Sequence, residues 1–511
     1  MKKLLKFIFH RVVLLGLVIV IQLAALMVVI LKFQEYFVYF YVFCFILSVV
    51  VVLNIINSRS NPAYKIAWIV PILLVPIFGG LFYLLFGSNK LSEHTQKKMD
   101  QITQKIQQQW NQHNTVLEEL AQKDINATNQ SRYIQNYAFY PPYRNDSATY
   151  FPLGEIKFEH LKEELKKAER FIFMEYFILE EGIMWNTILD ILCQKAAEGV
   201  DVRIIYDDFG CIMTLPYQYN RKLERMGIQC EIFNPFIPIA SSRLNNRDHR
   251  KIVVIDGHTA FTGGINLADE YINAYPKHGH WKDTAIMIKG EAVCSFTVMF
   301  LSMWDYLRNI DEDVDKFYSK DLPSQSTTYD GYIQPFTDSP LDHEPVGETV
   351  YLNLINKAKK YIYINTPYLI IDNEMVTALC IAAKAGIDVR IVTPHVADKW
   401  FVHAVTRAYY DNLIECGVKI YEYTPGFIHA KTFLVDDIYG VVGSINLDYR
   451  SLYLHFECGV WMYQTSCLQD MKHDYEKTLE VCEQITLEAC RKTPFYRRMI
   501  GSILRVFAPL M

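Results

Sequence analysis

The sequence predicts an α/β protein made of two repeated αβα halves that share one active site at their interface, preceded by transmembrane helices. Three observations lead to this prediction. A motif around His249 returns around His429, strand-like and helix-like segments alternate in the same order in two regions, and three long apolar runs lie near the N-terminus. The chain of 511 residues is long enough for a doubled domain with additional segments.

Composition narrows the classes of function. The formal net charge is −5, so no overall positive charge points to nucleic acid as a partner. Eleven cysteines are scattered along the chain, and their spacing argues against a disulfide framework. We expect most of them to be small residues of the core.

Residues 1–90 are predicted to form a membrane region with two to three transmembrane helices. Its apolar runs are Val12–Leu31, Phe37–Ile56 and Ile66–Phe86, each near the length of about 20 residues that spans a bilayer. Prolines and glycines interrupt the third run, so it either spans the membrane or is re-entrant. The basic residues favour opposite sides for the folded part in these two cases, and the sequence leaves its side of the membrane open.

Residues 91–150 are predicted to be a polar linker that leads into the folded part. The Gln-rich stretch 91–131 is expected to be an exposed helix or a linker that leaves the membrane. Proline-rich turns at 140–143 and 151–154 mark the beginning of the folded part.

The two halves are predicted at 151–320 and 321–490. In the first, the pattern predicts helices at Phe158–Ala168 and Trp185–Glu198 and strands at Phe171–Phe177 and Val202–Tyr206. The second repeats this order, with helices at Thr349–Lys360 and Asn373–Ala385 and strands at Tyr361–Ile364 and Val389–Val392. Such βα units indicate mostly parallel sheets that are covered on both faces.

The repeated motif begins with His249-Arg250-Lys251 and again with His429-Ala430-Lys431, and every matching position is shifted by the same 180 residues. Side chains alternate along a strand, so the His and Lys of each copy point the same way. Asp256 and Asp436 have the opposite parity and lie seven residues on, roughly 23 Å away along a straight strand. We therefore expect these two carboxylates to close the following turn or to support the site from behind.

Each copy continues into a glycine-rich stretch, Gly263-Gly264-Ile265-Asn266 in the first and Gly443-Ser444-Ile445-Asn446 in the second. Glycine lets the backbone approach a ligand closely, and we expect Gly264, Ser444 and the amides of Asn266 and Asn446 to lie near the substrate.

Together the two copies provide two imidazoles, two ammonium groups and two amides, a set that suits a phosphodiester. Cations and amide donors stabilise charge on the non-bridging oxygens. One imidazole can attack phosphorus while the other gives a proton to the leaving oxygen. A metal site is the alternative, but a lysine beside each histidine would repel a divalent cation.

Two further carboxylates match between the halves. Asp283 and Glu457 each stand at the head of an apolar strand that follows the glycine-rich stretch. A catalytic imidazole is usually held through its second nitrogen by a carboxylate, and Asp283 and Glu457 are candidates for that role. A salt bridge at the strand end is the alternative.

The doubled H-x-K-x4-D pattern resembles the signature of the phospholipase D superfamily, over about Phe171–Tyr463. Within it, the N-terminal region and the segment Asn446–Ser451 are similar to bacterial cardiolipin synthases. The resemblance implies two phospholipase D-like halves with a site at their interface. It also implies that the signature residues are the catalytic set, namely His249, Lys251, Asp256, His429, Lys431 and Asp436.

The activity that this resemblance implies is phosphatidyl transfer between two phosphatidylglycerol molecules, which gives cardiolipin and glycerol through a phosphatidyl-histidine. It implies membrane phospholipids as partners, neither metal nor nucleotide as cofactor, and a multi-pass protein of the bacterial cell membrane. A phospholipase D-type hydrolase, transfer to another lipid alcohol, a nucleic-acid phosphodiesterase and a non-catalytic membrane scaffold are the alternatives. The identity of the nucleophilic histidine and the oligomeric state stay open.

The last residues, 491–511, are basic with bulky apolar residues between the charges. This pattern predicts a segment that lies at the membrane interface. An ordinary amphipathic helix that packs on the protein is the alternative.

Overall fold

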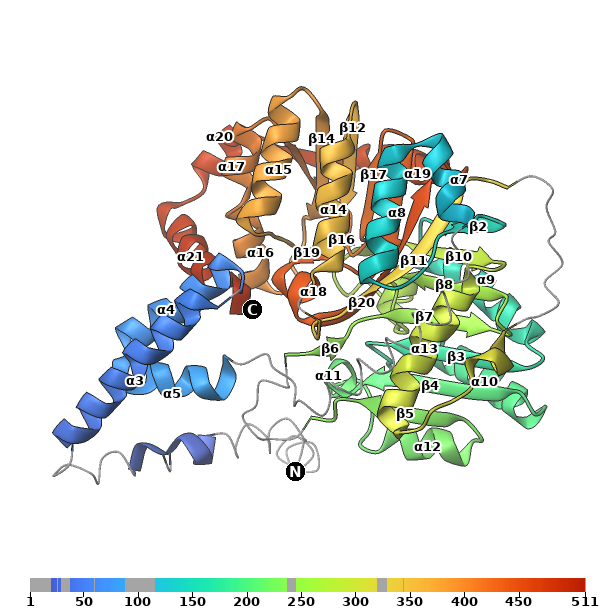
Figure 1. The fold of residues 1–511 in the computed structure, drawn as a ribbon, viewed down its shortest axis with the longest axis horizontal. Helices are drawn as coiled ribbons and strands as arrows, with labels where there is room; N and C mark the ends of the chain where they lie inside the picture. Colours follow the sequence, from blue (N-terminus) through green and yellow to red (C-terminus); the bar gives the residue numbers. More distant parts are fainter. Residues whose placement is uncertain are drawn as a thin grey trace.

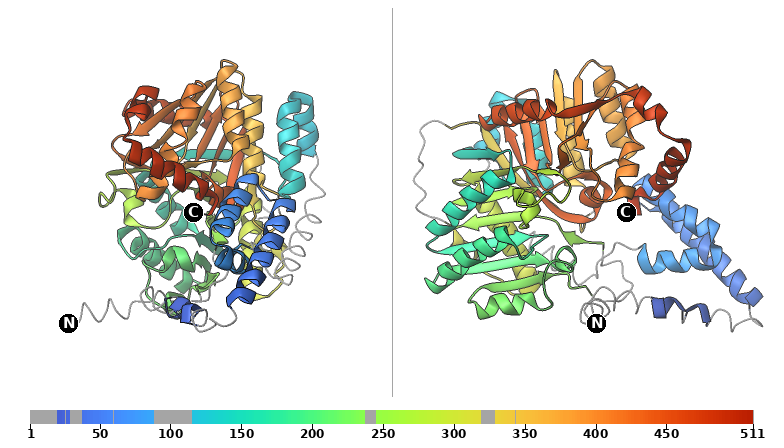
Figure 2. Two further views of the ribbon diagram at one scale, coloured as in Figure 1. Left: turned by 90° about the vertical axis from the view of Figure 1, so that its left-hand side faces the viewer. Right: turned by 180° about the vertical axis from the view of Figure 1, so that it is seen from behind.

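The computed structural model describes residues 20–24, 26–28, 37–58, 60–87, 115–236, 245–318, 329–342 and 344–510. Two α/β halves make up most of this part of the chain (Figure 1). A smaller group of apolar helices lies beside the second half, near the C-terminus (Figure 2). The predicted pair of repeated halves is confirmed.

The first half is built on a sheet of seven strands. Their order is β2 (Ser147–Phe151), β10 (Ala285–Lys289), β8 (Thr259–Gly263), β7 (Lys251–Ile255), β3 (Phe171–Tyr176), β4 (Asp201–Asp207) and β5 (Gln229–Phe233). The predicted strands are β3 and β4. The predicted helices are α9 (Gly154–Lys167) and α10 (Ile183–Ala197), with ends that differ from the prediction by a few residues.

The second half has the larger sheet. Its strands follow the order β1 (Tyr143–Arg144), β11 (Tyr332–Asp338), β20 (His455–Tyr463), β18 (Tyr439–Gly443), β17 (Thr432–Val435), β12 (Tyr361–Asn365), β14 (Asp388–Pro394), β15 (Lys419–Tyr423) and β21 (Cys482–Ile485). The predicted strands are β12 and β14, and the predicted helices are α14 (Val346–Lys357) and α15 (Asn373–Lys384).

The prediction of mostly parallel sheets is wrong. In the first half β4 runs parallel to β3 and β5, in the second β14 runs parallel to β12 and β15, and the other neighbours in the two strand orders given above are antiparallel. The reason lies in the repeated motif itself. Its strands β7 and β17 turn back at once into β8 and β18, and so short a connection allows only an antiparallel pair.

The core is continuous from one half to the other. Helix α13 (Val293–Arg308) packs between the strands of the first half and β11 of the second. Its Phe300 stacks on Phe173 of β3 with ring centroids 4.6 Å apart, and both belong to the same buried cluster as Phe433 and Val441. The two halves therefore fold against a shared core.

Two short strand pairs cross the interface beside the motifs. Strand β6 (Arg247–Asp248) pairs with β20 of the second half, and β9 (His280–Lys282) of the first half pairs with β16 (Gly426–Ile428). Each pair ends next to one of the two histidines, so main-chain hydrogen bonds fix the register of one half against the other at the site.

Asp256 and Asp436 occupy the turns after the motif strands. The Asp256 carboxylate accepts hydrogen bonds from the backbone N–H groups of Glu169, Arg170 and Phe171 at 2.8–2.9 Å. The Asp436 carboxylate accepts the equivalent bonds from residues 359–361 at 2.6–2.8 Å. Both carboxylates hold the beginning of a central strand, β3 or β12. These hydrogen bonds support a structural role for both carboxylates, as their strand parity indicates, and the catalytic membership implied by the resemblance stays a prediction.

Residues 115–137 are not a linker, which corrects part of the prediction for 91–150. They form α7 (Thr115–Lys123) and α8 (Ile125–Tyr137), and α8 packs against α14 and β11. Gln130 and Ser131 are buried on its inner face. The packing of α8 could not be predicted from the sequence because the buried face of this helix is largely polar. The earlier part of the Gln-rich stretch lies outside the described residues.

The second apolar run forms α3 (Phe37–Asn57), the one helix among the described residues that is long and apolar enough to cross a membrane. The third run forms two shorter helices, α4 (Pro62–Leu74) and α5 (Pro76–Phe86). They separate at Val75, because the residue before a proline disfavours helical backbone. The first run lies mostly outside the described residues, so this part of the chain shows one candidate span where several were expected.

The C-terminal segment forms α21 (Phe495–Val506), which packs against α16 (Trp400–Arg407) and α4. Its apolar side chains Phe495, Tyr496, Met499, Ile500, Ile503 and Val506 are between 36% and 80% exposed. The final turn η5 (Ala508–Leu510) packs on α4. The C-terminus is therefore joined to the apolar helices, and the outer face of α21 stays uncovered by the described residues.

Asp436→Asn should lower the free energy of unfolding by about 1–3 kcal/mol, because an amide oxygen replaces a carboxylate that satisfies three N–H groups. Asparagine tolerates the positive φ of 57° at this position, so the change tests the hydrogen bonds. We expect a lower midpoint in thermal unfolding of the detergent-solubilised protein. Asp190→Asn, on the exposed side of α10, is the control that should leave the midpoint unchanged. Equal midpoints for the two variants would contradict the structural role of Asp436.

Candidate active site

The two repeated histidines meet where the halves join, and each is held by a carboxylate from the opposite half. His249 Nδ1 lies 2.9 Å and 3.0 Å from the two carboxylate oxygens of Glu457. His429 Nδ1 lies 2.6 Å from Asp283 Oδ2. All four side chains are buried. Each carboxylate thus contacts a motif histidine, as the sequence suggested. The sequence did not indicate that each carboxylate would come from the half opposite to its histidine.

Main-chain hydrogen bonds reinforce this crossing. The His249 N–H donates to the carbonyl of Phe456 at 3.0 Å, and the His429 N–H donates to the carbonyl of Lys282 at 2.7 Å. Phe456 and Lys282 immediately precede the two carboxylates. Each histidine is therefore fixed to the opposite half through both its backbone and its ring.

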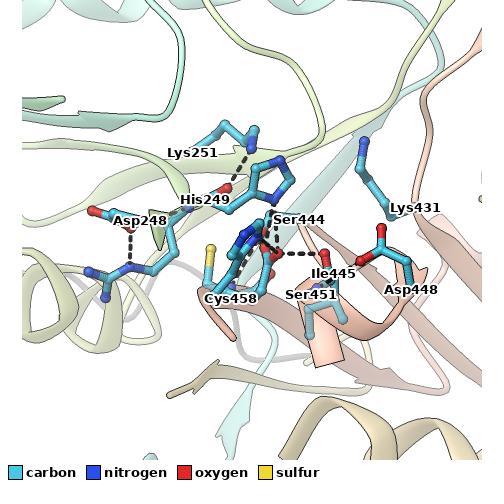
Figure 3. Close-up of polar contacts among 12 residues, drawn as sticks. Asp248, His249, Lys251, Lys431, Ser444, Ile445, Asp448, Ser451 and Cys458 are labelled. Atoms are coloured by element: carbon cyan, nitrogen blue, oxygen red, sulfur yellow. Dashed lines mark hydrogen bonds and ion pairs between the residues drawn. The ribbon is translucent and has the colours of Figure 1, made fainter. Parts of the chain in front are cut away.

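The surroundings of the two carboxylates differ. Glu457 also accepts hydrogen bonds from the hydroxyls of Ser444 and Ser451, the latter at 2.7 Å. Figure 3 shows both serines on the same side of His249. Asp283 accepts instead from the backbone N–H of Thr284 at 2.8 Å. The two carboxylates are therefore held by different hydrogen-bond donors.

Gly264 explains the single difference between the glycine-rich stretches. A Cβ atom at Gly264 would lie 2.1 Å from Asp283 Oδ1, so no side chain fits there. In the second copy the carboxylate belongs to the longer Glu457, and the Ser444 hydroxyl donates a hydrogen bond to it. Gly264 and Ser444 thus support the carboxylates, whereas the sequence suggested a place next to the substrate.

The two lysines lie beside the imidazoles. Lys251 and Lys431 each donate from Nζ to the carbonyl of the histidine two residues earlier, and Lys431 Nζ is also 2.8 Å from His429 Nδ1. Burial is the main cause that lowers the pKa of Lys251 to about 8 and that of Lys431 to about 7. These ammonium groups are poorly compensated in the resting protein, and an anion would favour their charged form.

Burial also acts on the histidines and on Asp283. Burial first, and the positive charges of Lys251 and Lys431 next, lower the pKa of both imidazoles well below the usual range. Burial raises the pKa of Asp283 to about 7, against the opposing effect of Lys431. The resting site therefore favours neutral imidazoles, and a negatively charged ligand would be needed to stabilise an imidazolium.

The two asparagines differ in their contacts. The Asn266 oxygen accepts from the N–H of Ile178 at 3.1 Å, and its amide donates to the Tyr271 hydroxyl at 2.7 Å, so protein groups use both ends. The oxygen of Asn446 is buried and has no hydrogen-bond partner among the described residues. Asn446 is thus the better placed of the two to meet a ligand.

Aromatic rings line the site next to both His249 and His429. Phe177 stands against His249 with ring centroids 5.1 Å apart, and Tyr271 and Trp281 flank His429 at 5.6 Å and 5.5 Å. The sequence analysis did not single out these rings, nor the contact of Ser451 with Glu457. Ser451 belongs to the segment that carries the family resemblance, which was the one available signal.

Figure 3 shows Lys251 and Lys431 reaching toward the space next to the His249 ring. Two imidazoles backed by carboxylates, with a lysine on each side, form a largely buried seam. Such a seam can stabilise a phosphoryl group while one imidazole attacks it and the other moves a proton.

Comparisons with known proteins agree with this geometry. The family described as "Cardiolipin synthase, PLD-like domain" matches residues 161–304 and 351–479, one segment in each half. A second family, described as "Phospholipase_D-nuclease N-terminal", matches residues 46–88, which include most of α3 and all of α4 and α5.

Similar sequences extend over most of the chain. A cardiolipin synthase of Alkalihalophilus pseudofirmus is 34% identical over 471 residues, 91% of this chain and 93% of that protein. One of Clostridium perfringens is 35% identical over 465 residues, 89% of this chain and 95% of that protein. An uncharacterized protein of Streptococcus mutans serotype c is 45% identical over 460 residues, 90% of this chain and 99% of that protein.

Among solved structures, the phosphatidylserine synthase of Haemophilus influenzae has the same fold. It superposes with a TM-score of 0.56 at 15% identity, over 75% of this chain and 98% of that one. The family match in both halves and the similarity over the whole length agree with each other. The chain belongs to the cardiolipin synthase family of the phospholipase D superfamily.

Proposed function

We propose that the protein is a phosphatidyltransferase that makes cardiolipin and glycerol from two molecules of phosphatidylglycerol. The observation that carries the proposal is the crossed pair of imidazoles, each backed by a carboxylate of the other half and flanked by a lysine. The family membership supplies the substrate class, because the relatives named above are cardiolipin synthases.

In the first step one imidazole Nε2 attacks the phosphorus of phosphatidylglycerol. A P–N bond forms, the P–O bond to glycerol breaks, and the opposite imidazolium gives its proton to the departing oxygen. In the second step that imidazole takes a proton from a hydroxyl of a second phosphatidylglycerol. The new oxygen attacks phosphorus, the P–N bond breaks, and cardiolipin leaves. Protons balance over the two steps.

The imidazolium of the first step forms when the phosphodiester enters. Both imidazoles are neutral in the resting seam, since burial and the lysines lower their pKa. The negative phosphodiester compensates Lys251 and Lys431 and raises the pKa of the imidazole next to it. Substrate binding therefore creates the acid that the leaving group needs.

The substrate lies in a membrane, and two parts of the chain fit that environment. Helix α3 has a mean hydropathy of 2.6 over Val38–Asn57 and only 22% of this span is buried. The same helix carries the exposed Arg497 and Arg498, the latter 4.0 Å from Asp411, and this positive charge suits anionic headgroups. We propose that α3 spans the membrane, that the first apolar run adds a second span, and that α21 lies in the interface.

The central test compares His249→Ala and His429→Ala in detergent micelles with phosphatidylglycerol labelled in its headgroup. Each change should reduce glycerol release by about three orders of magnitude or more, because the two imidazoles act as one unit. His403→Ala, which removes an imidazole of α16, should retain activity. Excess EDTA should cause no loss. Substantial activity in either seam variant would refute the shared mechanism, and phosphatidic acid in place of cardiolipin would make the protein a hydrolase.

The pH profile should show an alkaline limb set by the lysines. With Lys431 near pKa 7 and Lys251 near 8, both ammonium groups lose their protons as pH rises, and the phosphodiester is bound less well. We expect kcat/KM, which reports the free enzyme, to fall more steeply above about pH 7, in addition to the fall at lower pH that follows from loss of the catalytic imidazolium. Lys431→Arg keeps its charge at every pH used, so its limb should move up toward the value of Lys251. If Lys431→Arg leaves the alkaline limb at the same pH, the limb reports the titration of another group.

The membrane proposal predicts a difference between bilayers and micelles. The double change Arg497→Glu, Arg498→Glu should reduce the rate several-fold in vesicles rich in phosphatidylglycerol, because the helix loses its attraction to anionic headgroups. The same protein should be nearly unaffected in neutral detergent micelles. Lys166→Glu, an exposed change on α9 of the first half, is the matched control. An equal loss in vesicles and micelles would contradict an interfacial α21.

A further inference from the structure

His455 lies in the seam, but the proposed reaction does not use it. Its side chain is 9% exposed, and both ring nitrogens are buried without a hydrogen-bond partner among the described residues. The ring centroid is 5.6 Å from that of His249, and Nδ1 is 3.8 Å from Glu457 Oε1. A buried polar group that lacks a hydrogen bond is costly, and beyond the 3.8 Å contact with Glu457 the described residues supply no partner for the His455 ring.

The repeat shows that only one of the two halves has an imidazole at this position. Because Glu457 matches Asp283, His455 matches Trp281, and each lies beside one histidine of the seam at a similar distance. An indole is only a donor and does not bind metals in this way, whereas an imidazole is a common metal ligand. The duplicated site therefore carries a third ligand-type side chain only on the His249 side.

We propose that His249, His455 and Glu457 form a binding site for a divalent transition metal such as Zn²⁺, and that the bound metal switches the enzyme off. One ligand atom from each of the three buried side chains lies within 4.8 Å of the others. Two imidazoles and a glutamate are a known ligand set for zinc, with bonds of about 2.0–2.2 Å and thus roughly 3.4 Å between neighbouring ligands. The present distances require shifts of about an ångström.

The proposed site lies on the Nδ1 side of His249, whereas the proposed reaction uses Nε2. Glu457 contacts the ring through Nδ1, while Nε2 remains for the reaction. The lysines, whose charge argues against a metal between the two catalytic histidines, donate to the carbonyls of His249 and His429. The hydroxyls of Ser444 and Ser451 hold the Glu457 carboxylate, as outer groups around a metal ligand commonly do.

Occupation would block either role of His249. The metal would take the Nδ1 lone pair, so the single proton of the neutral ring would lie on Nε2 and the ring could not gain a second. Without an imidazolium it cannot act as the acid, and with a proton on Nε2 it has no lone pair to attack phosphorus. The inhibitory part of this inference rests on the proposed function, but the binding part does not.

Direct binding is tested with Co²⁺ on the full-length protein in detergent, since four-coordinate Co²⁺ with nitrogen and oxygen ligands absorbs in the visible range. We expect a saturable band with one Co²⁺ per chain, displaced by Zn²⁺ and absent in His455→Asn. His395→Asn is the matched control, because His395 forms another histidine–glutamate pair, with Glu422 at 3.0 Å, outside the seam. A band that is missing in the wild type, or retained in His455→Asn, would overturn the proposal.

Inhibition is tested by headgroup release at free Zn²⁺ concentrations set by a metal buffer, because anionic headgroups also bind cations. Each variant is compared with its own metal-free rate. With Zn²⁺, the rate of headgroup release should fall at least about ten-fold in the wild type and in His395→Asn, and EDTA should restore it. His455→Asn should keep most of its rate. Equal sensitivity of all three proteins would overturn the regulatory role. If the protein binds Co²⁺ as expected but makes no cardiolipin, the proposed function is refuted and the proposed metal site is not.

Discussion

The structure depends on one constraint, the exchange of carboxylates between the two halves. His249 is held by Glu457 and His429 by Asp283, so neither half contains a complete catalytic group. The bond distances leave little freedom, and the halves must dock within a few tenths of an ångström to satisfy both pairs at once. The short strand pairs β6–β20 and β9–β16 and the shared core around α13 are the parts that ensure this docking.

The same docking creates the electrostatics of the site. It buries two lysines, two imidazoles and two carboxylates together, and burial is the first cause of the displaced pKa values of Lys251, Lys431 and Asp283. Buried charges are costly unless they are paired. A phosphodiester is the partner that relieves this cost, because it brings negative charge to both lysines.

Much of this could be predicted from the sequence, because repetition is a local and countable signal. The constant shift of 180 residues located both histidines and both lysines, the apolar strands after the glycine-rich stretches located Asp283 and Glu457, and helix and strand periodicity located β3, β4, β12 and β14. Pairing between distant segments could not be predicted in this way. Sheet direction, the crossing of the carboxylates and the burial of α8 depend on which segments meet, and no spacing along the chain encodes it.

The two motifs are alike because of the duplication, but the residues around them differ between the two halves. The first half combines a short carboxylate with Gly264, and the second combines a longer one with the hydroxyls of Ser444 and Ser451. Each combination places the carboxylate at hydrogen-bond distance from an imidazole, so geometry is preserved while the local polarity changes. A site with two equal imidazoles could not tell nucleophile from acid. Different surroundings remove that equality, and the two halves are free to take different roles in one reaction.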